Sequence, residues 1–315
     1  MPSALLPSRS PKPQFQKPEL QVIRASVLGF CMGVRRAVRL ACAEAGRAQA
    51  GKVCSFGPLI HNPQALEELK RRGVEILDGS TLPENLSGVS VIIRAHGVSP
   101  QTEADLRRRG AALIDATCPK VKASQLKAAA LANAGYWLFL AGEATHAEIA
   151  GIRGYVETAF CAVAGCAAEA EEIAAKLHEE DPDAKTALIA QTTISAEEYQ
   201  AIGEAIARYF PDLEIAQTIC TATKERQGSL RELLGKVDAV VIAGRKESAN
   251  TRRLLAIAEA SGKPCAFVET EADIPPAFFE FQTIGLAAGA STPDAVIDAV
   301  ERALGGMSSM TALHV

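Results

Sequence analysis

Short apolar runs alternate with Ala-rich helical stretches along this chain, and the alternation constrains the fold more than any other feature. Residues 89–94, for example, precede a helical stretch at 100–109, and residues 136–141 precede another at 147–155. The same rhythm continues to the C-terminal third of the sequence. Strands that alternate with helices are typical of parallel sheets assembled from right-handed βαβ units. The sequence therefore predicts an α/β fold.

Three elements recur in the same order within this alternation. The first is a cysteine ahead of a basic helical stretch, and its copies, separated by 87 and 102 residues, are Cys31, Cys118 and Cys220. Two polar loops follow each cysteine. The first set of loops contains His61, His146 and Ser248, and the second set contains His96, Thr192 and Ser291.

This recurrence predicts three similar parallel-sheet α/β domains. We expect them at residues 22–118, 119–215 and 216–305. A Pro-rich segment at 1–21, which we expect to be a disordered tail, precedes them, and a second tail at 306–315 follows.

The composition, charge and hydropathy of the chain limit the kinds of partner and the location that we expect. A hydrophobic content of 48% and a charged content of 22% are those of a globular protein and exclude a disordered or collagenous one. The net charge is −4 with acids and bases interspersed, so we expect no nucleic-acid partner. No apolar run approaches the roughly 20 residues that span a bilayer. We expect no membrane partner and, without a recognisable signal peptide, a cytoplasmic location.

The eight cysteines direct attention to metal binding. In a large chain without an export signal, reduced thiols that bind metal or catalyse a reaction are favoured over disulfides. Cys42, Cys54 and Cys265 lie in helix or strand patterns and are expected in the core. Cys161 and Cys166 could pair or bind zinc, although they lack a second pair of ligands.

The three recurrent cysteines are candidates for one metal centre. In open parallel sheets, ligands bind outside the carboxyl ends of the strands. If the three domains pack about a pseudo-threefold axis, the cysteines and all six polar loops converge on one cavity. A site of four cysteines is closed, whereas three leave one position open. A [4Fe–4S] cluster held by Cys31, Cys118 and Cys220 would have an open fourth iron. The alternative is that each is a small buried hydrophobe.

The polar loops predict an anion site beside that centre. Three of the five histidines, His61, His96 and His146, lie in them. With the helix openings that hold Thr192, Ser248, Asn250 and Ser291, they suit a diphosphate, and helix N-termini would add their dipoles. The alternative is that each Ser or Thr is an ordinary N-cap.

Glu148, two residues after His146, is the candidate proton donor. A water-poor cavity would raise the pKa of its carboxyl group and hold a proton for transfer. The alternative is an ionised carboxylate on an exposed loop.

Nine motifs carry a resemblance to a known family, from about residue 22 to residue 305. In order, they are Gly29-Phe30-Cys31-Met32-Gly33-Val34, Leu59-Ile60-His61-Asn62, Ala95-His96-Gly97-Val98, Asp115-Ala116-Thr117-Cys118-Pro119, His146-Ala147-Glu148, Gln191-Thr192-Thr193, Thr218-Ile219-Cys220, Ser248-Ala249-Asn250-Thr251 and Ala288-Gly289-Ala290-Ser291-Thr292-Pro293-Asp294. They resemble the motifs of the IspH/LytB family of 4-hydroxy-3-methylbut-2-enyl diphosphate reductases.

The resemblance implies a trefoil of three α/β domains around a central, oxygen-sensitive iron–sulfur cluster. It implies an oxidoreductase that removes the hydroxyl group of (E)-4-hydroxy-3-methylbut-2-enyl diphosphate, giving isopentenyl and dimethylallyl diphosphate. This is the last step of the methylerythritol phosphate route of isoprenoid biosynthesis, with a ferredoxin or flavodoxin as electron donor. The cluster ligands match Cys31, Cys118 and Cys220. The diphosphate contacts match His61, His96, Ser248, Asn250 and Ser291, and the residues around the allylic hydroxyl match His146, Glu148 and Thr192.

Two departures from the family pattern concern the diphosphate end. Ala249 stands where the family usually has a second serine, and Arg245 and Glu247 replace small or amide residues. We expect the guanidinium of Arg245 to be within reach of the same phosphate. Two alternatives to an enzyme remain: a redox or iron sensor that binds a cluster without turning over a substrate, and a structural zinc protein.

Overall fold

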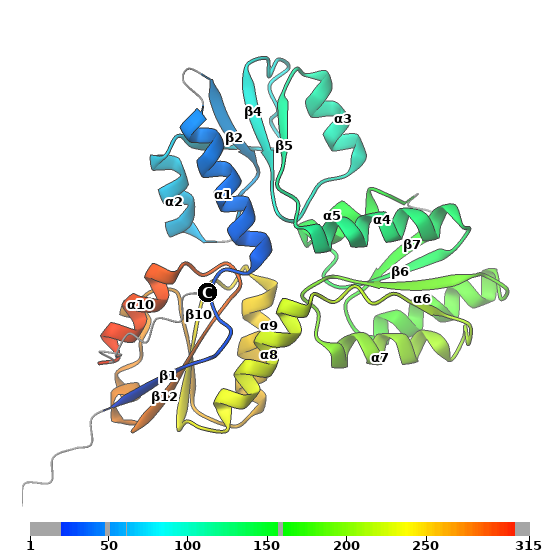
Figure 1. Cartoon of the computed structure of the whole chain (residues 1–315). Helices are drawn as coiled ribbons and strands as arrows, with labels where there is room; N and C mark the ends of the chain where they lie inside the picture. Colours follow the sequence, from blue (N-terminus) through cyan, green and yellow to red (C-terminus); the bar gives the residue numbers. More distant parts are fainter. Residues whose placement is uncertain (1–19, 48–50, 61, 157–159, 306–315) are drawn as a thin grey trace, which may run out of the picture.

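The computed structural model describes residues 20–47, 51–60, 62–156 and 160–305. These residues form three α/β units arranged around a common centre (Figure 1). Each unit is built on one four-stranded sheet whose paired strands are all parallel. The predicted architecture of three similar parallel-sheet units is confirmed.

The first unit has the strand order β3-β2-β4-β5. Its strands are β2 (Lys52–Phe56), β3 (Val74–Leu77), β4 (Val89–Ile93) and β5 (Ala112–Asp115), and its helices are α1 (Met32–Arg47), α2 (Pro63–Arg71) and α3 (Pro100–Arg108). The second unit has the order β7-β6-β8-β9. It contains β6 (Trp137–Ala141), β7 (Cys161–Ala164), β8 (Thr186–Ala190), β9 (Glu214–Ile215), α4 (Pro119–Asn133), α5 (Ala147–Arg153), α6 (Ala167–Glu180) and α7 (Ala196–Ala207).

The third unit has the order β1-β12-β10-β11. It contains β1 (Gln21–Arg24), β10 (Ala239–Ala243), β11 (Cys265–Val268), β12 (Thr283–Ala288), α8 (Thr221–Leu234), α9 (Ala249–Ala260) and α10 (Asp294–Ala303), with the short 3-10 helices η2 (Glu271–Asp273) and η3 (Pro276–Glu280). No helix in the described part of the chain is both long and apolar enough to cross a membrane.

Local sequence signals explain where many of these helices begin. Asn62 and Ser99 accept hydrogen bonds from the backbone N–H groups of the first turns of α2 and α3, and a proline follows each of them. Proline suits the first helical position because its missing N–H would have no partner there. Ser195 and Glu198 form a capping box at the start of α7. The central strands β8 and β10 are buried along their whole length, as expected of sheets covered by helices on both faces.

The three sheets repeat one arrangement around the recurrent cysteines. In each, an edge strand (β1, β5 or β9) precedes the cysteine and pairs with the strand that precedes the second polar loop (β12, β4 or β8). The cysteine N–H then donates to a backbone carbonyl of that loop. The bonds are Cys31 to Ala290 at 3.1 Å, Cys118 to Ala95 at 2.9 Å and Cys220 to Thr192 at 3.0 Å.

The strand β1 departs from the expected division of the chain. The sequence assigns residue 21 to a tail and residues 22–118 to one domain, but β1 pairs with β12 in the third sheet. In the first two units the edge strand follows the unit's last helix (β5 after α3, β9 after α7). No strand follows α10 in the described residues, and the N-terminal segment supplies the edge strand of the third sheet instead. Residues 1–19 and 306–315, which carry the rest of the two expected tails, lie outside the described residues.

An ion pair fastens β1 to the last helix. Arg24 donates from Nε to Glu301 Oε1 at 3.0 Å and from Nη2 to Glu301 Oε2 at 2.5 Å, and Nη2 also contacts Asp298 at 2.7 Å. Glu301 is only 5% exposed, so its carboxylate depends on this partner. Hydrogen bonds that Arg24 donates to Glu301 and Asp298 raise the pKa of Arg24 further above its ordinary value.

We expect Arg24→Met to lower the free energy of unfolding by about 1–2 kcal/mol, since a buried charge loses its partner while solvent screens part of the pair. Adding Glu301→Gln should restore part of the loss. The matched control, Arg208→Met, removes an exposed pair with Glu171 and should change stability by less than about 0.5 kcal/mol. Urea unfolding followed by circular dichroism measures all variants, and equal effects at both arginines would contradict the role of β1.

Candidate metal centre and substrate cavity

The carboxyl ends of the strands of all three sheets surround one cavity. Its empty volume is about 810 Å³, part of it open to solvent. It is lined by ten of the eleven side chains proposed from the sequence: Cys31, Cys118, Cys220, His96, His146, Glu148, Thr192, Ser248, Asn250 and Ser291. The eleventh, His61, lies outside the described residues.

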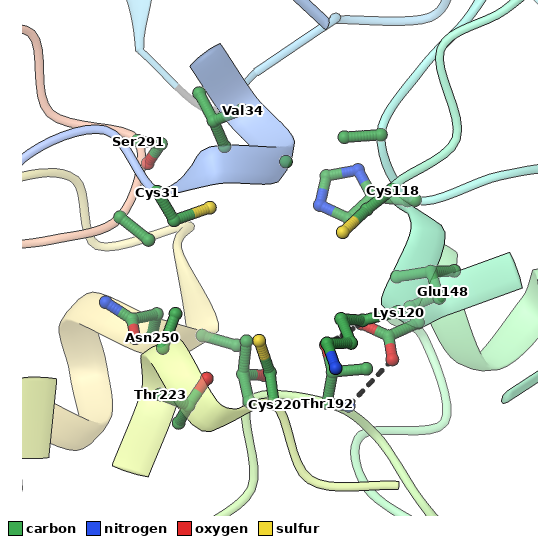
Figure 2. A pocket seen from close by; sticks show the side chains of 18 of the residues that line it. Cys31, Val34, Cys118, Lys120, Glu148, Thr192, Cys220, Thr223, Asn250 and Ser291 are labelled. Atoms are coloured by element: carbon green, nitrogen blue, oxygen red, sulfur yellow. Dashed lines mark hydrogen bonds between the residues drawn. The ribbon is translucent and has the colours of Figure 1, made fainter. Parts of the chain in front are cut away.

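The three recurrent cysteines come from three different units. Cys118 and Cys220 are the N-caps of α4 and α8, and Cys31 directly precedes α1. Their sulfur atoms point into the space between them (Figure 2). Burial raises the pKa of Cys118, the N–H groups of Lys120 and Val121 oppose that shift, and negative charge on Cys31 and Cys220 adds to it. Three thiolates in this buried space would repel one another, so a cation bound between them is needed to keep all three ionised.

The donor set fits a polynuclear iron–sulfur group better than a zinc ion. Within the described ranges, no three His, Cys, Asp or Glu side chains are placed to hold one metal ion, whereas zinc needs all its sulfurs within about 2.3 Å. Beside Cys118, a Cβ atom at Gly33 would lie 2.6 Å from the sulfur, so only glycine leaves the room. Sulfurs that face a shared space from three sides suit a cluster with several metal atoms.

Glu148 is held by two hydrogen bonds in a buried position. Its Oε1 accepts from the backbone N–H of Thr192 at 2.7 Å, and its Oε2 accepts from the Thr192 hydroxyl at 2.9 Å (Figure 2). The residue is 1% exposed. Burial raises the pKa of Glu148 to about 7, although Thr192 and the charge of Arg253 oppose the shift. This carboxyl group can therefore hold a transferable proton near neutral pH.

The other two carboxylates of the polar loops have different surroundings. Burial acts to raise the pKa of Glu143, but Arg252 and Arg253 bind it and bring its pKa below the ordinary value. Glu247 is exposed and pairs with Arg245. The opposite pKa shifts of Glu148 and Glu143 separate an acid from an ionised neighbour. The alternative of an exposed loop carboxylate does not apply to Glu148.

Two histidines lie beside Glu148. His146 is the N-cap of α5, and its Nδ1 accepts from the backbone N–H of Glu148 at 3.2 Å. This bond assigns the proton of a neutral His146 ring to Nε2. The ring of His96, from the loop after β4, meets the His146 ring edge-on with centroids 5.3 Å apart.

The third unit contributes the anion-binding side of the cavity. Ser248 is the N-cap of α9, Asn250 lies in its first turn, and Ser291 precedes α10. All three residues are at most 7% exposed. Asn250 Nδ2 has no hydrogen-bond partner among the described residues. In the view of Figure 2, Asn250 and Ser291 lie across the cavity from Glu148. An unsatisfied donor at a helix N-terminus suits an anionic group.

Arg245 does not contribute to this side, contrary to expectation. Its guanidinium binds Glu247 and Glu269, and the residue is not part of the cavity wall. Ala249 does line the wall, where it offers no side-chain donor.

The other five cysteines do not line the cavity. All eight cysteines are free thiols, so Cys161 and Cys166 form no disulfide. As predicted, Cys54 is buried, and Cys42 and Cys265 pack against hydrophobic core.

Sequence reasoning did not propose four polar residues of the cavity wall: Lys120, Thr193, Thr223 and Arg226. Arg226 resembles a surface residue because it follows Lys224 and Glu225. The available signal is its helical register, since Arg226 is four residues before Leu230 and seven before Leu233, both buried on the inner face of α8.

Known proteins match most of the chain. The family model described as LytB protein matches residues 22–305. Relatives named 4-hydroxy-3-methylbut-2-enyl diphosphate reductase include that of Treponema denticola, 42% identical over 90% of this chain and 98% of the relative. The relative from Aquifex aeolicus is 39% identical over 90% of this chain and 95% of its own length.

Two solved structures agree with these matches. The structure of (E)-4-hydroxy-3-methyl-but-2-enyl diphosphate reductase, described as the terminal enzyme of the non-mevalonate pathway, has a TM-score of 0.67 at 36% identity and covers 91% of this chain and 99% of that one. The E-1-hydroxy-2-methyl-but-2-enyl-4-diphosphate reductase of Plasmodium falciparum has a TM-score of 0.83 and covers 92% and 89%. At 23% identity, the second structure shows the shared fold alone.

The raised pKa of Glu148 predicts how its carboxyl group titrates. The group is protonated below pH of about 7 and ionised above it, so any step that takes this proton slows as the pH rises through that value. Infrared difference spectra of wild type minus Glu148→Gln isolate its carboxyl band. We expect half of the band to be lost near pH 7, and a midpoint near the ordinary value of 4.5 would contradict the buried environment.

Proposed function

This chain belongs to the LytB family, and from that membership we propose that it reduces (E)-4-hydroxy-3-methylbut-2-enyl diphosphate to isopentenyl and dimethylallyl diphosphate. The reaction is the terminal step of the non-mevalonate pathway. The main observation behind the proposal is that three cysteines from three units line the same cavity as Glu148, a buried glutamate with a raised pKa.

The metal-binding part of the proposal rests on the donor set. Cys31, Cys118 and Cys220 would hold one [4Fe–4S] cluster with an open fourth iron, for which Gly33 leaves room beside Cys118. The bound cluster would supply Lewis acidity and one-electron transfer. A ferredoxin or flavodoxin would deliver the electrons one at a time.

The anionic end of the substrate would lie against the third unit. Ser248, Asn250 and Ser291 would donate to the diphosphate, and the N-terminus of α9 would add its dipole. His61 and His96 are proposed as further contacts. The diphosphate takes no part in the chemistry, so this end serves to orient the allylic carbons.

The hydroxyl end would lie against Glu148, His146 and Thr192. Overall, the substrate gains two electrons and two protons, its C–O bond breaks, and water leaves. Glu148 would supply the proton that turns the departing hydroxyl into water, because its carboxyl group holds that proton near neutrality. The Thr192 N–H and hydroxyl would then stabilise the carboxylate that remains.

The apolar part of the wall would keep water from the reacting carbons. Val34, Leu59, Ile60 and Val121 line the cavity, and Leu59 and Ile60 are at most 1% exposed. A dry wall also preserves the raised pKa of Glu148, because burial is the largest cause of that shift.

Cys118→Ser is expected to abolish the iron–sulfur group and turnover, since a hydroxyl is a poor thiolate substitute for iron. The matched control is Cys166→Ser. Cys166 is also a helix N-cap without a side-chain cap bond, but it is exposed and is not part of the cavity wall. Loss of the iron–sulfur group is measured after anaerobic purification, from the iron and sulfide content and the paramagnetic resonance spectrum. A Cys118→Ser protein with a full cluster and normal turnover would refute the ligand assignment.

Glu148→Gln keeps the shape of the side chain and removes the transferable proton. We expect turnover with the allylic diphosphate to fall about 10²–10⁴-fold, as for loss of a general acid, while the cluster spectrum still responds to substrate. Glu143→Gln, in the loop before α5, is the control and should retain turnover within a few-fold. A wild-type protein that binds a cluster yet never turns over substrate would instead favour the redox or iron sensor.

A further inference from the structure

Arg226 is a buried cation in the wall of the cavity. It lies in α8, the helix that Cys220 caps, and is 3% exposed. Its Nη2 donates to the carbonyl of Gly29 at 2.6 Å, and its Nη1 donates to the carbonyl of Ala222 at 3.4 Å. Its Nε has no hydrogen-bond partner among the described residues. Five donors in a dry site are thus only partly satisfied.

Among the described residues, Arg226 forms no ion pair with a carboxylate, although the charge of the adjacent Glu225 acts on it weakly. Its hydrogen bonds in the described part of the chain go to backbone carbonyls, whereas arginines such as Arg24 and Arg253 bind glutamates directly. Burial lowers the pKa of Arg226, and the negative charges of Cys31 and Cys220 are the largest influences that oppose this. A buried charge without compensation is costly. The two cavity cysteines are therefore its main source of compensation.

The same side chain joins two elements that carry those cysteines. Gly29, the acceptor for Nη2, lies two residues before Cys31 and has a φ of +75°, a conformation that favours glycine. Arg226 therefore fastens the loop before Cys31 to the helix after Cys220. None of the residues used in the proposed mechanism makes this link between the Cys31 loop and α8.

We propose that Arg226 is a positioning residue for the iron–sulfur group: it fixes the Cys31 loop against α8, and its charge favours the reduced form of the group. This inference rests on the proposed function. On reduction, the group gains one electron, the ferredoxin or flavodoxin loses one, and no bond to Arg226 forms or breaks. A fixed positive charge in a medium of low dielectric stabilises the added negative charge.

Three variants separate the charge from the side-chain shape. Arg226→Met removes the charge and the hydrogen bonds, and Arg226→Lys keeps the charge without the guanidinium fork. Arg231→Met is the matched control, because it removes the same charge from the same helix at a position that is 47% exposed and paired with Glu197. Each protein is purified anaerobically and titrated with dithionite against mediator dyes, with reduction followed by visible absorption and paramagnetic resonance.

At a fixed applied potential, we expect the ratio of reduced to oxidised group to fall at least tenfold in Arg226→Met, which is 59 mV for a one-electron couple. Arg226→Lys and Arg231→Met should stay within about threefold of wild type. Loss of the whole group in Arg226→Met, with retention and a wild-type ratio in Arg226→Lys, also supports the role of the charge.

Other outcomes overturn the inference. It fails if Arg226→Met holds the iron–sulfur group with the wild-type ratio of reduced to oxidised group. It also fails if this ratio falls as far in Arg226→Lys as in Arg226→Met. A third contrary result is that neither variant folds or binds the iron–sulfur group. The last result would assign Arg226 to structure alone. Wild-type protein without any iron–sulfur group would instead refute the proposed function.

Discussion

Three backbone hydrogen bonds hold the centre of this molecule together. In each unit, the N–H of a cysteine that follows an edge strand donates to the carbonyl of the loop beside it. The bond places the sulfur at the carboxyl end of the sheet, at the start of a helix, and the three sheets bring these ends to one cavity. Without parallel strand pairing in all three units, the cysteines would share no common space.

The third sheet is completed by the N-terminal strand β1. The edge strand of the third sheet comes from the opposite end of the described chain, so the position of Cys31 depends on the pairing of β1 with β12. Arg24 and Glu301 strengthen that pairing from the outside, and Arg226 fastens the following loop from the inside. The first cysteine is thus the one whose position depends on the most distant contacts in sequence.

Burial gives the cavity its chemical character. The same exclusion of water raises the pKa of Glu148 to about 7 and leaves Arg226 dependent on the charges of two cysteines. Glu143, only five residues before Glu148, remains ionised because two arginines bind it. In the proposed reaction, protons, electrons and phosphate charge would therefore be handled by different parts of one cavity: the second unit around Glu148, the sulfurs in the middle and the start of α9.

The α/β class, the threefold recurrence and ten residues of the cavity wall follow from the sequence alone. Periodic patterns and matched loops are local signals, and parallel strands bring their carboxyl ends together whatever the exact packing. The sheet to which β1 belongs is known only from the folded structure, because the sequence of an edge strand carries little information about its partner strand. The folded structure also decided that Glu148 is buried, that Arg245 turns away to bind Glu269, and that Arg226 faces inward. The sequence specifies which side chains can carry a charge, but the surroundings of each side chain depend on which distant elements pack against it.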